Sequence, residues 1–130
     1  MGRLIPAAVF VLAFTAYAAT AYPSFAPRDS ADLARAAITL GVAHPPGYPL
    51  YALLGHVWLR LLPWGDAVYR LNLLSAACGA LAAALLAAAC RRHGRAAAVA
   101  AGLSFAFCAP LWKFSLLSEM YSLQAAFAAA

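Results

Sequence analysis

Two acidic stretches of this sequence are suited to proton transfer. Asp29 and Asp32 follow an uncharged apolar segment over residues 4–27, and Glu119 stands just before another apolar segment. Acidic side chains at the edge of membrane-inserted sequence are costly to keep there and usually have a function. An aspartate at a helix start has a fixed position and limited hydration, which suit a general base that deprotonates a hydroxyl group. Asp29 is therefore the candidate catalytic base, and the ordinary role of a helix N-cap is open to it as well.

A rigid turn downstream of these aspartates predicts a shaped pocket. The run His44-Pro45-Pro46-Gly47-Tyr48-Pro49 combines backbone-restricting residues with aromatic side chains. His44 is expected to anchor the turn or to contact a substrate, and Asp32 has an expected ion-pair partner in Arg35, three residues along. Arg70, together with Arg60 and Lys113, is a candidate phosphate contact, since a guanidinium can bind phosphate through two hydrogen bonds.

Glu119 is the second candidate carboxylate. Its ordinary role would be a first-turn acid that complements the dipole of the following helix. Its functional role would place it with Asp29 on one external site, where the two could hold a divalent cation. Two carboxylates are too few to specify a metal. The three cysteines (Cys78, Cys90 and Cys108) lie in or beside apolar segments, and their spacing fits neither a zinc site nor a disulfide framework.

The composition decides the class of protein. Of the 130 residues, 66% are hydrophobic and only 10% are charged, which leaves too little polar surface for a soluble domain of this size. The net charge of +5 does not indicate nucleic-acid binding, because the basic residues are scattered and no basic face with interleaved aromatics accompanies them. We therefore expect an all-α integral membrane protein with a polytopic helical bundle.

The apolar segments predict about three full spans and the start of a fourth. A membrane-crossing helix needs about 20 mostly apolar residues. We place the spans at about 4–22, 71–90 and 96–111, with an incomplete fourth at 119–130, all in one domain over 1–130. The basic group Arg91, Arg92 and Arg95 places the loop between the second and third spans in the cytoplasm. Asp29 and Glu119 then lie outside. The fourth span stops in alanine-rich sequence, which predicts the front part of a longer protein.

The external loop over 23–70 is expected to contain two short helices. The first covers about Ser30 to Leu40, with Gly41 as its stop signal. Three prolines and a glycine exclude a continuous span over 36–59. The second helix, over about 50–62, would lie in the membrane interface, where Trp58 and Trp64 suit the headgroup level.

Several runs of the sequence resemble one membrane family. They are Asp29-Ser30-Ala31-Asp32-Leu33, His44-Pro45-Pro46-Gly47-Tyr48-Pro49-Leu50, Tyr69-Arg70-Leu71-Asn72-Leu73-Leu74, and the stretch from Trp112 through Glu119 to Leu123. The family is domain of unknown function 2723, which includes an animal protein O-mannosyltransferase and resembles the GT-C glycosyltransferase superfamily. The resemblance implies a multi-span helical fold of GT-C type, a polyprenyl-phosphate sugar donor and a catalytic base in the first external loop, at Asp29. It also implies that Glu119 contacts donor phosphate or metal.

This chain departs from the family pattern at three points. The family often has glycine where this chain has Arg28, and glutamate where it has Asp32. GT-C enzymes also have many more spans and usually an external domain. The role of Asp32 is therefore less well supported by the resemblance than the role of Asp29.

Together these expectations predict a membrane glycosyltransferase. It would transfer a sugar, with mannose as the expected one, from a polyprenyl-phosphate donor to an extracytoplasmic hydroxyl on protein or glycan, with inversion. Asp29 would be catalytic, and the donor- or substrate-binding residues would be Asp32, His44, Tyr48, Arg70 and Glu119. The alternatives are a lipid-linked sugar flippase, whose acids should lie mid-membrane in broken helices, and a non-catalytic or truncated membrane subunit. The alanine- and arginine-rich composition indicates a bacterial plasma membrane.

Overall fold

The computed structural model describes residues 4–27 and 29–130, and within these ranges the chain is all-helical and contains no strand. The all-α prediction is thereby confirmed. The elements are α1 (Leu4–Thr20), α2 (Ser30–Thr39), α3 (Pro49–Leu61), α4 (Ala67–Cys90), the short 3-10 helix η1 (Arg91–His93), α5 (Arg95–Ala106), α6 (Ala109–Ser115) and α7 (Tyr121–Ala128).

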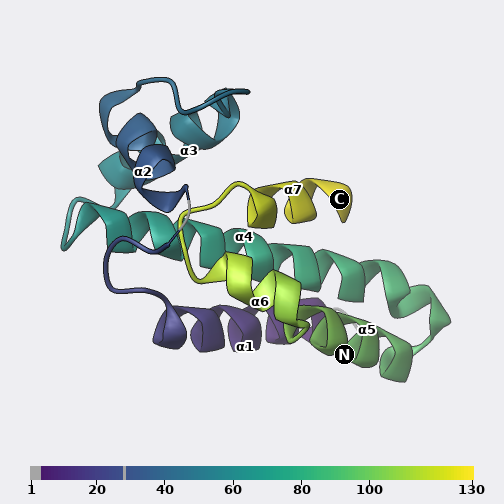
Figure 1. Ribbon diagram of the computed structural model, residues 1–130. Coiled ribbons are helices and arrows are strands. Elements are labelled where there is room, and N and C mark those ends of the chain that lie inside the picture. Colours follow the sequence, from purple (N-terminus) through teal and green to yellow (C-terminus); the bar gives the residue numbers. More distant parts are fainter. Residues whose placement is uncertain (1–3, 28) are drawn as a thin grey trace.

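The long helix α4 is the central element of the fold. It packs against each of the other α-helices, and its 24 residues give it a length of about 36 Å. In Figure 1, α1, α5, α6 and α7 lie along α4, whereas α2 and α3 stand together at its amino-terminal end. The turn at η1 lies at the opposite end of α4. The fold therefore separates the segment with the two aspartates from the basic turn by the length of one helix.

Small side chains let the helices around α4 approach closely. Alanines on one face of α4 pack against α1 and against the end of α5, together with the buried residues Val9, Ala13, Tyr17 and Ala106. A methyl group added at Gly79 would lie 2.0 Å from the Ser115 hydroxyl oxygen, and one at Gly102 would lie 2.8 Å from the Ala87 methyl. Such small-residue contacts are typical of helix packing in membranes, where hydrophobic burial does not drive helix association.

Only one of the predicted spans is present as a continuous membrane-length helix. Among the described residues, the helical stretch Ala67–His93 alone is long and apolar enough to cross a membrane. It contains the predicted span over 71–90 and begins earlier, because Asp66 caps it by accepting a hydrogen bond from the Tyr69 backbone N–H at 2.9 Å. The first predicted span is a helix of 17 residues, Leu4–Thr20, so the expected bundle of about three full spans is not confirmed.

The third predicted span, over 96–111, is not one helix. It is divided into α5 and α6, which meet at an angle of 60°. Pro110 has no N–H group to donate to the Ala106 carbonyl, so a continuous helix cannot form there. The Tyr17 hydroxyl donates to that carbonyl instead. The chain beyond the break is helical as far as Ser115.

The external segment agrees more closely with the prediction. Both short helices of the predicted loop are present, as α2 and α3. The segment that joins them contains Pro45 and Pro46, and α3 begins at Pro49. The left-handed residue that ends α2 is Leu40, with φ of 53°, rather than the expected Gly41. The fourth helix, α7, begins at Tyr121 rather than at residue 119.

Candidate functional site

The start of α2 is held in place by α4. The buried Asn72 side chain donates hydrogen bonds to the Tyr22 carbonyl at 2.8 Å and to the Ser24 carbonyl at 3.2 Å. Ser30 closes the last turn before α2 through its hydroxyl group, which donates to the Ala26 carbonyl and accepts from the Ala26 N–H. These bonds fix the backbone on either side of residues 27–29, and thereby the position from which the Asp29 side chain extends.

Asp29 occupies the N-cap position of α2 without acting as a cap. Its side chain makes no capping hydrogen bond within the described part of the chain, in contrast to Asp66 at the start of α4. Instead, Asp29 Oδ2 lies 3.6 Å from Nε2 of His44, and its side chain is 55% exposed. The carboxylate is therefore fixed at a helix start and accessible to a substrate, which are the two properties that a general base requires.

Asp32 holds the His44 turn against α2. Its Oδ2 accepts hydrogen bonds from the His44 backbone N–H at 2.7 Å and from Nδ1 of the same residue at 2.9 Å, while Oδ1 accepts from Arg35 at 3.1 Å. The backbone N–H, the imidazole and Arg35, in that order, lower the pKa of Asp32 to about 2. The predicted Asp32–Arg35 pair is present, and Asp29, Asp32, Arg35 and His44 together form a group that we call the aspartate–histidine cluster.

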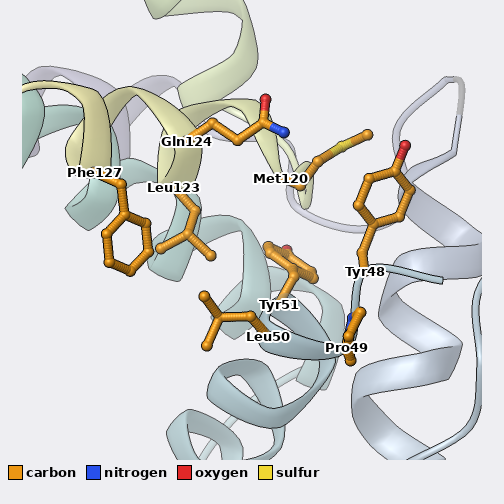
Figure 2. A pocket seen from close by; sticks show the side chains of 8 residues that line it. All are labelled: Tyr48, Pro49, Leu50, Tyr51, Met120, Leu123, Gln124 and Phe127. Atoms are coloured by element: carbon orange, nitrogen blue, oxygen red, sulfur yellow. The ribbon is translucent and has the colours of Figure 1, made fainter. Parts of the chain in front are cut away.

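A pocket begins beside this cluster. The ring of Tyr48 packs edge-on against the His44 ring, with centroids 5.5 Å apart. Tyr48 also forms one end of an apolar cavity of about 200 Å³ between α3 and α7. Figure 2 shows Leu123 and Phe127 of α7 facing Leu50 and Tyr51 of α3, with Tyr48 and Pro49 at the other end. The expected pocket at the Pro-Pro-Gly turn is thus a groove that leads away from the cluster.

Glu119 lies in a different environment from Asp29. Its side chain is buried, and its backbone N–H and carbonyl both pair with the Ser75 hydroxyl at 3.3 Å. The neighbouring Ser118 donates to the Ser30 carbonyl at 3.3 Å, which brings the segment before α7 next to the start of α2. Tyr51 completes this buried polar group, and burial raises the pKa of its hydroxyl while Cys78 and Glu119 add to the effect.

The buried polar group contains residues that the sequence analysis did not single out. Asn72, Ser75 and Ser118 stand within apolar or loop sequence, and each is fully or almost fully buried in the structure. Their signal in the sequence is polarity within segments that are otherwise uncharged and apolar. A buried polar side chain must find a hydrogen-bond partner, and these partners join α2, α4 and the α6–α7 connection behind the cluster.

The divalent cation that the sequence suggested at Asp29 and Glu119 stays a prediction. Over the described ranges, no group of three or more histidine, cysteine, aspartate or glutamate side chains is arranged to hold a metal ion. Asp29 is exposed whereas Glu119 is buried behind the start of α2. The chemistry described below therefore depends on the side chains of this chain and not on a metal ion.

The basic candidates are placed away from the cluster. The Arg70 guanidinium donates to the Leu59 carbonyl at 3.0 Å and to the Leu62 carbonyl, and it thereby closes the carboxyl end of α3. Arg60 donates to His56 at 3.0 Å on the same helix. In this structure Arg70 has a structural role, and its contact with donor phosphate stays a prediction.

Comparisons with known proteins agree with the sequence motifs. Residues 29–130 match the family model described as the Protein O-mannosyl-transferase TMEM260 N-terminal domain. The chain belongs to this family. The match begins at Asp29 and covers the whole aspartate–histidine cluster, the groove between α3 and α7, and the buried polar group.

Two curated relatives extend this finding. Over 118 residues the chain is 40% identical to Protein O-mannosyl-transferase TMEM260 of Mus musculus, a match that covers 89% of this chain and 17% of the relative. Over 125 residues it is 26% identical to Protein O-mannosyl-transferase tmem260 of Dictyostelium discoideum, covering 93% of this chain and 15% of the relative. The chain thus spans about a sixth of the length of these relatives. No solved structure matches it significantly.

Proposed function

We propose that this chain forms the catalytic-base region of a membrane protein O-mannosyltransferase. The enzyme transfers mannose from a polyprenyl-phosphate carrier to a hydroxyl group of a protein on the extracytoplasmic side of the membrane. Membership of the TMEM260 N-terminal family supports the reaction class. The observation that carries the proposal is the Asp29 carboxylate, which is fixed at a helix start, makes no capping bond and is open to solvent.

The chemistry assigned to Asp29 is the activation of the acceptor. Its carboxylate takes the proton from the acceptor hydroxyl while the oxygen forms a bond to the anomeric carbon of the sugar. The bond from that carbon to the phosphate oxygen breaks on the opposite face, and the electron pair leaves with the phosphate. The anomeric centre is therefore inverted.

The groove between α3 and α7 supports a lipid-linked donor. Its lining is almost wholly apolar, with the side chains of Leu50, Met120, Leu123 and Phe127 among its walls. An isoprenoid chain seated there would bring its phosphate toward the end of the groove at Tyr48, next to the cluster. Asp32 and His44 then contribute to the sugar end of the donor site, and Tyr48 separates the sugar end from the lipid end.

The ends of α4 support the extracytoplasmic placement. Arg91, Arg92 and Arg95 surround a surface hollow together with Ile5, at the end of α4 that is remote from α2 and α3. By the positive-inside rule this end faces the cytoplasm. The aspartate–histidine cluster then lies on the other side, where a bacterial plasma membrane would present it to the periplasm or the exterior.

The proposal is tested by comparing two aspartates that both stand at helix starts. In membranes that contain the longest natural form of the protein, transfer from polyprenyl-phosphate-mannose is measured for wild type, Asp29→Asn and Asp66→Asn. We expect Asp29→Asn to lower transfer by about 10²-fold or more, the usual contribution of a general base. Asp66→Asn removes a true cap, so it should cost about 1 kcal/mol of stability and leave transfer largely unchanged.

Other outcomes would replace the proposal. Equal transfer by Asp29→Asn and wild type would mean that the Asp29 side chain does not act as the base. An absence of transfer by wild type would favour a non-catalytic membrane subunit. Movement of the intact lipid-linked sugar across the membrane, without transfer to an acceptor, would favour a flippase.

A further inference from the structure

The hydrogen bonds of Asp32 determine which nitrogen of His44 carries the proton. The pKa of Asp32 is lowered to about 2, so its carboxylate is ionised at neutral pH and can only accept hydrogen bonds. Its Oδ2 lies 2.9 Å from Nδ1 of His44, and Nδ1 must therefore be the protonated ring nitrogen. A neutral imidazole carries one ring proton, so the lone pair is on Nε2.

The lone pair of Nε2 is directed at the candidate base. Nε2 lies 3.6 Å from Oδ2 of Asp29, so two atoms that can only accept a hydrogen bond face each other. A proton delivered to either atom turns this contact into a hydrogen bond, and a proton on Nε2 makes that bond a charge-assisted one to the Asp29 carboxylate, which is the stronger kind. Asp29 and His44 are therefore arranged to share one incoming proton, and the bonds from Asp32 keep His44 in the required orientation.

The surroundings of His44 contain the groups needed for this role. The charged groups that face it are Asp29, just before α2, and Asp32 on α2, while Arg35 reaches it only through Asp32. From the start of α3 the Tyr48 ring packs against its edge. With neutral His44, the two aspartates and Arg35 sum to one negative charge, which favours the arrival of a proton.

We propose that His44 is a positioning residue that accepts, at Nε2, the proton that Asp29 removes from the acceptor hydroxyl. This inference rests on the proposed transferase function and adds a second residue to its base. The O–H bond of the acceptor breaks, the oxygen bonds to the anomeric carbon, and the proton passes from Asp29 to Nε2. After the phosphate has left with its electron pair, the proton is released from His44 to water, and a neutral His44 beside the ionised Asp32 is restored.

The test uses substitutions that separate the two sides of the imidazole. In His44→Asn, the amide nitrogen takes the place of Nδ1 and can still donate to Asp32, but no atom replaces Nε2. His56→Asn is the matched control, because Nδ1 of His56 also contacts an oxygen atom at 2.9 Å, in this case the Ala37 carbonyl, and His56 lies outside the cluster. Transfer is measured as a function of pH in membranes with the longest natural form of the protein.

We expect His44→Asn to lower transfer at neutral pH by about 10²-fold, as for loss of an acid–base group, and His56→Asn to leave it unchanged. The pH profile should also change shape between wild type and His44→Asn, because only wild type has a second group beside Asp29 that can hold the proton. A turn anchor alone would leave the shape of the profile unchanged.

A second variant distinguishes loss of the imidazole group from loss of the fold. In His44→Gly, imidazole added to the buffer should restore transfer at least tenfold, with the restored rate following the concentration of neutral imidazole. Full transfer by His44→Asn, or an unchanged pH profile together with no rescue by imidazole, overturns the role of His44. If those His44 results are obtained and Asp29→Asn is inactive in the same membranes, the proposed function stands while the inference about His44 fails. If wild type itself does not transfer mannose, both fail.

Discussion

Asp32 is the residue on which the geometry of the cluster depends. Its carboxylate accepts from the backbone and the ring of His44 and from Arg35, and it therefore ties a turn twelve residues downstream to the first turn of α2. The longer side chain of glutamate would have to fold back to reach the same two His44 donors, so the length of Asp32 fits this particular turn.

The Asp32–His44 bond predicts a measurable pH dependence. Its folded pKa of about 2 lies below the value of about 3.9 for an unfolded chain. The stabilisation of the turn is therefore fully present above about pH 4 and is lost as the pH falls through about 2. In Asp32→Asn, the His44 backbone amide should exchange its hydrogen roughly tenfold faster at neutral pH, because a charge-assisted bond is replaced by a weaker one.

The measurement is hydrogen exchange by NMR on the chain in detergent micelles. The Tyr69 amide, which donates to Asp66, serves as the internal reference and should exchange at the same rate in both proteins. Equal His44 exchange in wild type and variant would mean that Asp32 does not hold the turn.

At the scale of the elements, the break between α5 and α6 is compensated by α1. Pro110 leaves the Ala106 carbonyl without its helical partner, and the buried Tyr17 hydroxyl takes that place. An aromatic ring of α6, Trp112, also packs edge-on against the Tyr17 ring at 5.7 Å. One residue of α1 therefore both satisfies the broken backbone and contacts the helix beyond the break.

Tyr17→Phe should destabilise the fold by about 1–3 kcal/mol, the cost of leaving a buried acceptor without a partner. The ring and its contact with Trp112 are retained, so the loss measures the hydroxyl group alone. Thermal unfolding in micelles provides the comparison, with Tyr22→Phe as the control because the Tyr22 side chain is exposed. A change in Tyr17→Phe no larger than that in the control would contradict the role of the hydroxyl.

At the scale of the whole molecule, the two ends of α4 carry different chemistry. Helices α2 and α3 lie at one end, and the basic turn at η1 lies at the other (Figure 1). The first end therefore holds the aspartate–histidine cluster and the α3 wall of the groove. The hydrogen bonds from Asn72, Ser75 and Ser118 all lie toward the first end. These three buried polar side chains thus lie in the half of the fold that contains the cluster.

This polarity predicts opposite accessibility for the two ends. After Cys78, Cys90 and Cys108 have been replaced by serine, a single cysteine introduced by Ala31→Cys should react with a membrane-impermeant maleimide added to intact cells. One introduced by Arg92→Cys should react only after the membrane is opened. Both native residues are exposed, so a difference in labelling reports the side of the membrane. Labelling of both from outside would contradict the orientation.

The sequence predicted the helical class, the long apolar helix α4 and the two short helices correctly, because each depends on local apolar length or on proline and glycine. The break near Pro110 has a local signal in the proline itself, whereas its replacement hydrogen-bond partner, Tyr17, could not be predicted because it is remote in sequence. The sequence also missed the bonds from Asp32 to His44 and from Ser118 to Ser30, because both depend on tertiary packing. The roles assigned to Asp29, Tyr48 and Glu119 stay predictions, now with defined neighbours.

The bond from Ser118 to the Ser30 carbonyl has a consequence for biosynthesis. The two residues are 88 positions apart, and at about 5–20 residues per second the ribosome needs roughly 4 to 18 seconds to make the intervening chain. During that interval the start of α2 lacks its hydrogen bond from Ser118. The backbone beside Asp29 therefore gains this support only after the α6–α7 connection has been made, so translation itself sets the earliest time at which this part of the fold is complete.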